Sequence, residues 1–185
     1  NGKKYAENIS QLALANVDFD MQNRHHISYN LMMIHANTQS VGDYNGKNSI
    51  FSDDYENLGF TRRQQTNDNM LIVNQLMTNW GLTKSLSLDA GASYNMVKGY
   101  EPDRRINNLT KAEDGYTLLR GNSQQRYFST LDEDDLNVKA GLVYRLKDNI
   151  EEISNVRFGY TGRFVDDNFK ATEYNLTVGH VSDIP

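Results

Sequence analysis

A segment of strict alternation at residues 86–96 constrains the fold more than any other part of the chain. Apolar side chains occupy every second position, and serine, aspartate, glycine and asparagine occupy the positions between them. Such alternation predicts a β-strand with one apolar and one polar face. The segment is about twice as long as the commonest strands of soluble proteins. A tilted strand needs about 9–11 residues to cross a bilayer, so the segment fits a barrel wall between lipid and an aqueous lumen.

A second segment, residues 136–147, repeats this pattern. Leu136, Val138 and Ala140 begin its apolar set, which continues to Leu146. Lysine and arginine fall only on the other set, at Lys139 and at positions 145 and 147. The repeat predicts a second strand with the same division between a charge-free face and a wet face.

Composition limits the classes of protein that need to be considered. The 185 residues suit one ordinary domain. No run approaches the ~18 apolar residues that indicate a transmembrane helix, which excludes a helical membrane protein. The absence of cysteine excludes disulfides and thiolate chemistry. A net charge of −5 argues against nucleic acid as a partner. The mean hydropathy of −0.69 is compatible with a barrel, since half of each strand is polar.

The rest of the chain predicts an all-β antiparallel meander of about seven strands. The change from Leu12 and Leu14 to Val17 and Phe19 predicts a bulge near residues 15–16. A tight polar corner is expected at residues 166–168, while the two faces of residues 69–80 cannot be assigned. The expected strands lie at about 9–22, 26–38, 69–80, 86–96, 136–147, around 156–161, and at 170–181.

The connections between these strands are expected to alternate in length. The long ones, residues 39–68 and 99–135, would lie on one rim, because alternate connections of a meander lie on opposite rims. Short periplasmic turns and long extracellular loops are typical of outer-membrane barrels. The expected fold is therefore a section of a large transmembrane β-barrel. The alternative is a soluble secreted β-sandwich that binds glycan or protein through long loops.

Four stretches are similar to the barrel of TonB-dependent outer-membrane receptors. They are the strand–turn–strand unit at residues 79–95, the motif Gly-Tyr-Glu-Pro-Asp-Arg-Arg at 99–105, and the stretches 131–136 and 159–167. The similarity extends over most of the chain, and it rests on the order and spacing of the four stretches together.

This resemblance implies a larger parent protein in the bacterial outer membrane, with a plug domain inside a barrel of about twenty-two strands. The parent would contact outer-membrane lipid and import a scarce nutrient such as a siderophore, glycan or peptide, driven through periplasmic TonB. It implies no catalysis and no cofactor. Neither a plug nor a TonB-box-like start is recognised, and the chain ends in Asp-Ile-Pro without a terminal aromatic residue. We therefore expect residues 1–185 to be a section of one barrel.

The long connection at residues 99–135 is the best candidate for contact with the nutrient. Aromatic rings suit sugars, peptides and planar chelates, and arginine pairs with carboxylates. The alternative is that these side chains hold the loop to itself or to its neighbours. The candidates are Tyr100, Arg104, Arg105, Tyr116, Arg120, Arg126, Tyr127 and Phe128.

Metal binding and catalysis have weaker support in the sequence. His25 and His26 are adjacent, so on a strand they point to opposite faces and do not share a metal easily. Asp132, Asp134 and Asp135 offer oxygen ligands for calcium, with residues 166–167 as a partner on the same rim. The spacing of an EF-hand loop is absent, and a solvated acidic run is the favoured interpretation. The scattered histidines define no catalytic triad, so an enzyme is not expected.

Overall fold

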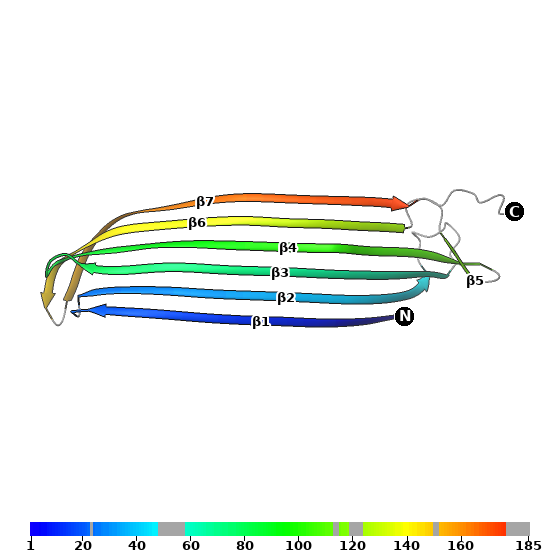
Figure 1. Cartoon of the computed structure of the whole chain (residues 1–185), viewed down its shortest axis with the longest axis horizontal. Coiled ribbons are helices and arrows are strands. Elements are labelled where there is room, and N and C mark those ends of the chain that lie inside the picture. Colours follow the sequence, from blue (N-terminus) through cyan, green and yellow to red (C-terminus); the bar gives the residue numbers. More distant parts are fainter. Residues whose placement is uncertain (23, 48–57, 113–114, 119–123, 150–151, 177–185) are drawn as a thin grey trace.

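The chain folds into one long antiparallel sheet in a computed structural model, which describes residues 1–22, 24–47, 58–112, 115–118, 124–149 and 152–176. The described elements are all strands (Figure 1). They are β1 (Gly2–Met21), β2 (His25–Lys47), β3 (Leu58–Gly81), β4 (Leu86–Ala112), β5 (Gly115–Leu118), β6 (Gln124–Asn149) and β7 (Glu152–Leu176).

Neighbouring long strands pair in chain order. The order across the sheet is β1-β2-β3-β4-β6-β7, and the short β5 pairs with the end of β4. This arrangement confirms the predicted up-and-down antiparallel meander. The connections still alternate, since residues 48–57 and 113–123 are longer than residues 22–24, 82–85 and 150–151. Gln22, in the first short connection, has a φ of 50°, and the amide of Arg24 donates to the carbonyl of Met21 at 3.1 Å.

The predictions of long loops and of a corner between the last two strands are wrong. Most of the stretches expected to be long loops extend the neighbouring strands: β2 runs to Lys47, β3 starts at Leu58, β4 runs to Ala112 and β6 starts at Gln124. The expected corner at residues 166–168 lies inside β7, where these residues pair with β6. The two C-terminal strands expected from the sequence are therefore one.

The expected bulge near residues 15–16 is also absent, because the β1–β2 register runs unbroken from Gly2 to Met21. Leu12 and Leu14 need no bulge, since a regular strand places them opposite Ile34 and Met32 on the sheet face away from Val17. Apolar pairs thus form on both faces of this hairpin.

The register assigns two faces to the whole sheet. We name them from β4: the apolar face carries Leu88, Ala92 and the even positions of residues 86–96, and the polar face carries Ser93 and the odd positions. The ambiguous third strand is now assigned, since Leu76 pairs with Ala92 and Gln75 pairs with Ser93.

A charge-free band follows the apolar face of the strands in the half of the sheet that contains the short connections. It includes Val17 and Phe19 on β1 and Phe158 and Tyr160 on β7. These four side chains are between 58% and 80% exposed. Within the described residues, no hydrophobic side chain is buried. The described sheet therefore has a single layer without a core of its own.

Hydrogen bonds between polar side chains connect neighbouring strands on the polar face. Asn16 donates to Asn30 at 2.5 Å, and Asn30 donates to Gln75 at 3.4 Å, which connects three strands. Farther across the sheet, Arg163 on β7 donates twice to Asp135 on β6, at 3.1 Å each. Polar pairs thus connect strands on this face, alongside the apolar pairs that β1 and β2 form there.

Candidate functional site

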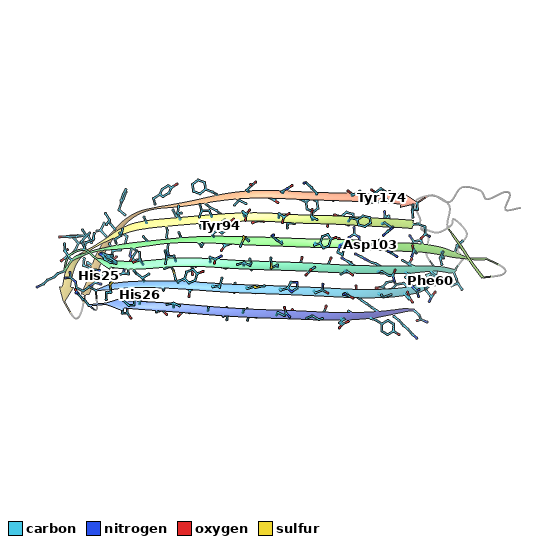
Figure 2. The ribbon with its side chains drawn as sticks, in the orientation of Figure 1. His25, His26, Phe60, Tyr94, Asp103 and Tyr174 are labelled. Carbon is cyan, nitrogen blue, oxygen red and sulfur yellow. The ribbon has the colours of Figure 1, made fainter. Side chains whose placement is uncertain are left out.

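Six of the eight predicted nutrient-contact residues lie on the paired ends of β4 and β6, away from the short connections. Figure 2 shows Asp103 in this half of the sheet, far from His25 and His26. The backbone here is strand because β4 pairs with β3 on one side and β6 on the other. Neighbouring side chains therefore alternate between the two faces.

A β-bulge divides this region of β4. Tyr100 pairs with Thr130 and Arg105 pairs with Arg126, so β4 contains one more residue than β6 over this interval. Pro102 lies at the irregularity, and proline has no amide hydrogen for a regular ladder. The extra residue reverses the alternation, so that Arg105 lies on the apolar-face side of the sheet together with Tyr100.

A first cluster forms around Asp103 on the apolar-face side. Arg126 donates to this carboxylate at 3.1 and 2.8 Å, and Arg105 donates to it at 2.5 Å. The hydrogen bonds from Arg126, together with Arg105, hold the pKa of Asp103 below its ordinary value. The guanidinium of Arg126 also lies 5.2 Å from the ring centre of Phe128, which meets Tyr174 edge-on at 6.0 Å. These contacts fix the bulge and join β4, β6 and β7.

A second cluster lies on the polar face. The guanidinium carbon of Arg104 is 4.1 Å from the ring centre of Tyr127, which is a close cation–π contact. Arg104 is also 3.8 Å from Glu101. The Oε1 atom of Glu101 is buried and has no hydrogen-bond partner among the described residues. The cluster offers a guanidinium and a carboxylate, which suit polar or planar groups.

The structure therefore separates the predicted residues into two groups. Tyr100, Arg105, Arg126 and Phe128 lie on the apolar-face side, and Arg104 and Tyr127 lie on the polar face. Tyr116 lies in β5, where its backbone pairs with Lys111 of β4. Arg120 lies outside the described residues. The six residues on β4 and β6 therefore do not form one site.

The three aspartates proposed as calcium ligands are also divided between the faces. Asp132 and Asp134 lie on the apolar-face side, where Asp134 accepts a hydrogen bond from the hydroxyl of Tyr94 at 2.8 Å. Asp135 lies on the polar face and accepts hydrogen bonds from Arg163. Within the described part of the chain, no group of three or more His, Asp or Glu side chains is arranged to hold a metal ion.

The two adjacent histidines both belong to β2 and lie on opposite faces of the sheet. His25 stacks on Trp80 with ring centres 4.1 Å apart. The Nδ1 atom of His26 lies 2.8 Å from Asp20, and its Nε2 atom lies 3.6 Å from Asp18. Both histidines act as contacts between neighbouring strands.

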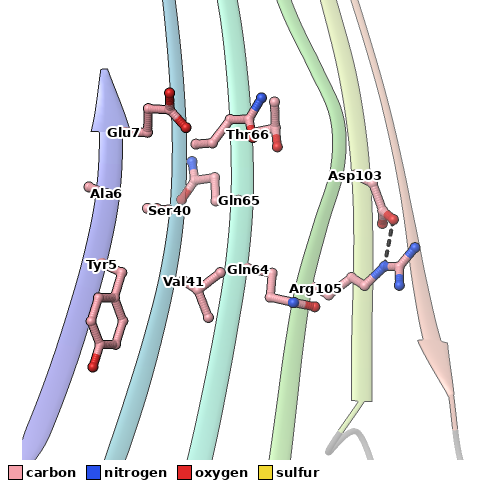
Figure 3. A pocket seen from close by; sticks show the side chains of 11 residues that line it. Tyr5, Ala6, Glu7, Ser40, Val41, Gln64, Gln65, Thr66, Asp103 and Arg105 are labelled. Atoms are coloured by element: carbon pink, nitrogen blue, oxygen red, sulfur yellow. Dashed lines mark hydrogen bonds and ion pairs between the residues drawn. The ribbon is translucent and has the colours of Figure 1, made fainter. Parts of the chain in front are cut away.

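Sequence reasoning missed a polar groove on the apolar-face side, next to the Asp103 cluster (Figure 3). The groove has a volume of about 520 Å³ and crosses β1 to β4. Tyr5, Val41, Gln64 and Arg105 form one row across it. No local motif could have indicated this groove, because its lining comes from four strands that are brought together only by the register.

Comparison with known proteins adds no identification. No family model matches the chain, and no curated protein matches it. In the part of the chain that the structure describes, no helix is long and apolar enough to cross a membrane.

Proposed function

We propose that this chain forms part of the wall of a transmembrane β-barrel in an outer membrane. The observation that carries the proposal is the exposed apolar band on a single-layer sheet that lacks a core among its described residues. Exposed apolar patches of this extent mark surfaces that contact another apolar phase. A barrel wall requires an apolar outer face and a polar inner face on the same strands.

Polar side chains within the band support this proposal. Asn74 accepts a hydrogen bond from the Tyr29 hydroxyl at 2.9 Å and donates to the Tyr94 carbonyl at 3.4 Å. Thr78 donates to the carbonyl of His26 at 2.9 Å. These contacts satisfy polar groups that face an apolar surface, as lipid contact requires.

The edge of the apolar band runs obliquely across the sheet, as the tilted strands of a barrel require. On β1 the first charge beyond the band is Glu7, and on β7 it is Asp166. Through the register, Asp166 is level with Ala13 of β1, six residues from Glu7. With about 3.3 Å per residue and about 4.8 Å between strands, this offset corresponds to a tilt of about 40°. Transmembrane barrels have tilts of about 35–45°.

We further propose that the parent protein is a TonB-dependent receptor that imports a scarce nutrient. The support is the resemblance of the four stretches described above, together with a polar face that suits a lumen. In this proposal the plug, the TonB protein and the nutrient approach the polar face. Arg104 and Tyr127 would then be the wall residues available to the nutrient, because their cation–π pair lies on that face.

The soluble sandwich finds less support. A sandwich needs a second sheet packed about 10 Å away on the apolar face. The described strands of this chain pair into one layer, and their apolar face is exposed.

Cysteine labelling of the intact, membrane-inserted protein tests the proposal. This chain contains no cysteine, so single cysteines at successive positions of residues 86–96 can be probed with a water-soluble maleimide. We expect Ser87→Cys and Ser93→Cys to react rapidly, and Leu88→Cys and Ala92→Cys to react at least tenfold more slowly. Equal reactivity on both faces, or recovery of the intact protein in a soluble periplasmic fraction, would refute the membrane wall.

A further inference from the structure

We propose that the polar groove on the apolar-face side binds the oligosaccharide headgroup of a glycolipid in the surrounding membrane. This inference rests on the proposed membrane wall. The groove lies on the same sheet face as the lipid-facing band, farther along the same strands. A molecule that contacts both regions must therefore approach from the outside of the wall, where membrane lipid is the neighbour.

The height of the groove above the hydrocarbon layer indicates which kind of lipid headgroup can reach it. On β3, Gln64 is six residues beyond Met70, the last apolar residue of the band. At about 3.3 Å per residue and a tilt of about 40°, this places Gln64 about 15 Å above the hydrocarbon edge. On β1, Tyr5 is four residues beyond Ile9, which corresponds to about 10 Å. The headgroup layer of an ordinary bilayer is only about 5–8 Å thick on each side, so a phospholipid headgroup does not reach the groove.

The chemistry of the lining favours a neutral sugar. Gln64 and Thr66 line the groove with an amide and a hydroxyl group (Figure 3). Gln39, the cross-strand partner of Thr66, adds a second amide to the lining. Such groups both donate and accept hydrogen bonds, as sugar hydroxyls require. Tyr5 adds an aromatic ring that is 67% exposed, which offers an apolar surface to a sugar ring.

The charges at the ends of the groove argue against a phosphate or carboxylate as the main ligand. Arg105 is already bound to Asp103 at 2.5 Å, and Arg126 shares the same carboxylate at 2.8 Å. Glu7, at the other end, would repel an anion. Glu7, Asp103 and Arg105 are the charged residues of the lining, and their formal charges sum to −1, so the lining as a whole does not attract an anion.

The size of the groove is compatible with this ligand. Its volume of about 520 Å³ lies within the range of about 300–1,000 Å³ found for small-molecule sites. An individual open groove of this kind binds a free sugar weakly, because few hydrogen bonds are fully shielded from water. Anchoring the sugar in the same membrane raises its local concentration to the millimolar range. Binding therefore depends on the lipid anchor.

The test uses the intact protein in phospholipid nanodiscs that contain one of two probes. The first probe is a diacyl glycolipid with a neutral tetrasaccharide headgroup, and the second has the same chains with phosphocholine. Native mass spectrometry measures the lipid retained on the protein. We expect the glycolipid to be retained at least tenfold more than the phosphocholine lipid. Equal retention of the two probes would overturn the inference.

Two variants on opposite faces locate the site. Tyr5→Ser removes the aromatic ring from the groove and should lower glycolipid retention about tenfold, whereas Tyr5→Phe should keep it. Tyr44→Ser is the matched control, because Tyr44 is an exposed tyrosine on the polar face of the same end of the sheet. Loss of retention in Tyr44→Ser but not in Tyr5→Ser would overturn the site.

Two further measurements separate the possible failures. Free tetrasaccharide at the same concentration should not displace the glycolipid, and efficient displacement would overturn the requirement for a lipid anchor. Heat-modifiable migration of the same samples reports barrel insertion independently. An inserted protein without glycolipid preference overturns this inference alone, whereas a protein that does not insert overturns the proposed membrane wall and this inference with it.

Discussion

A pair of adjacent substitutions on β4 gives the sharpest test of the two faces. Ala92 lies near the middle of the apolar band, with Leu76 and Val138 as its cross-strand neighbours. Ser93 is the next residue and lies on the polar face, between Gln75 and Asn137. Ala92→Arg and Ser93→Arg therefore add the same side chain at almost the same height on opposite faces.

The expected costs differ because the two faces meet different solvents. Arginine on the lipid face costs about 2–4 kcal/mol at the bilayer midplane. Ala92 has apolar neighbours on both sides, and its position within the band supports a value of about 3 kcal/mol for Ala92→Arg. Ser93→Arg stays in water beside amide side chains, so its cost should remain within about 0.5 kcal/mol. The difference corresponds to roughly a 60-fold or larger change in the folding equilibrium, since about 1.4 kcal/mol is a factor of ten.

Reversible unfolding of the intact protein from phospholipid vesicles measures these costs. The protein is folded into vesicles and titrated with guanidinium chloride, and tryptophan fluorescence reports the transition. The free energy of unfolding should fall for Ala92→Arg and stay close to wild type for Ser93→Arg, with similar denaturant slopes. Met96→Arg, at the edge of the band, should cost no more than about 1 kcal/mol. Equal losses for Ala92→Arg and Ser93→Arg would refute the assignment of faces to lipid and water.

Other predictions follow from close backbone contacts and from the Asp103 cluster. Gly159→Ala should lower the free energy of unfolding by about 1–3 kcal/mol, because the new Cβ would meet the Ala140 carbonyl oxygen at 2.8 Å. Gly46→Ala is the control, since Gly46 has open space around it, and it should change the free energy of unfolding by less than about 0.5 kcal/mol. Equal effects of the two substitutions in denaturant titrations would contradict this. Asp103→Asn should cost about 1 kcal/mol at pH 7. Hydrogen bonds from Arg126 lower the pKa of Asp103, so its contribution is complete above the unfolded value of about 3.9 and is lost as the pH falls through the lowered folded value. The stability difference between wild type and Asp103→Asn should therefore shrink below about pH 4, and a difference that stays constant to pH 2 would contradict this origin.

Strand alternation could be predicted from the sequence only where one face is apolar. The alternation of residues 86–96 and 136–147 predicts strands, and these residues lie in β4 and β6. Farther from the short connections both faces are polar, so residues 99–112 and 124–135 have the composition of loops although they pair as strands. Composition indicates whether each face of a strand meets water or an apolar phase, but it does not indicate whether the backbone is paired. The sequence therefore predicts loops that are longer than those in the structure.

Turn-forming residues caused the error in β7. Asp166, Asp167 and Asn168 are common in turns because their side chains bond to the local backbone. In the structure their backbones pair with Asp134, Glu133 and Asp132 of β6 instead. The long partner strand supplies a complete ladder on this side, and a complete ladder outweighs a local turn preference. Such an outcome depends on a partner that lies more than thirty residues away in the chain, so the local sequence cannot reveal it.

A single extra residue in β4 decides which residues of the candidate site lie on which face. Simple alternation would place Arg104 on the same face as Tyr100, and Arg105 on the other face. The bulge reverses this arrangement, so that Arg104 meets Tyr127 on the polar face and Arg105 meets Asp103 on the apolar-face side. The sequence contains Pro102 as a signal of an irregular ladder, but it does not specify which strand gains the residue. The bulge therefore decides which of two adjacent arginines would face a lumen and which would face the outer surface, and both proposals depend on that choice.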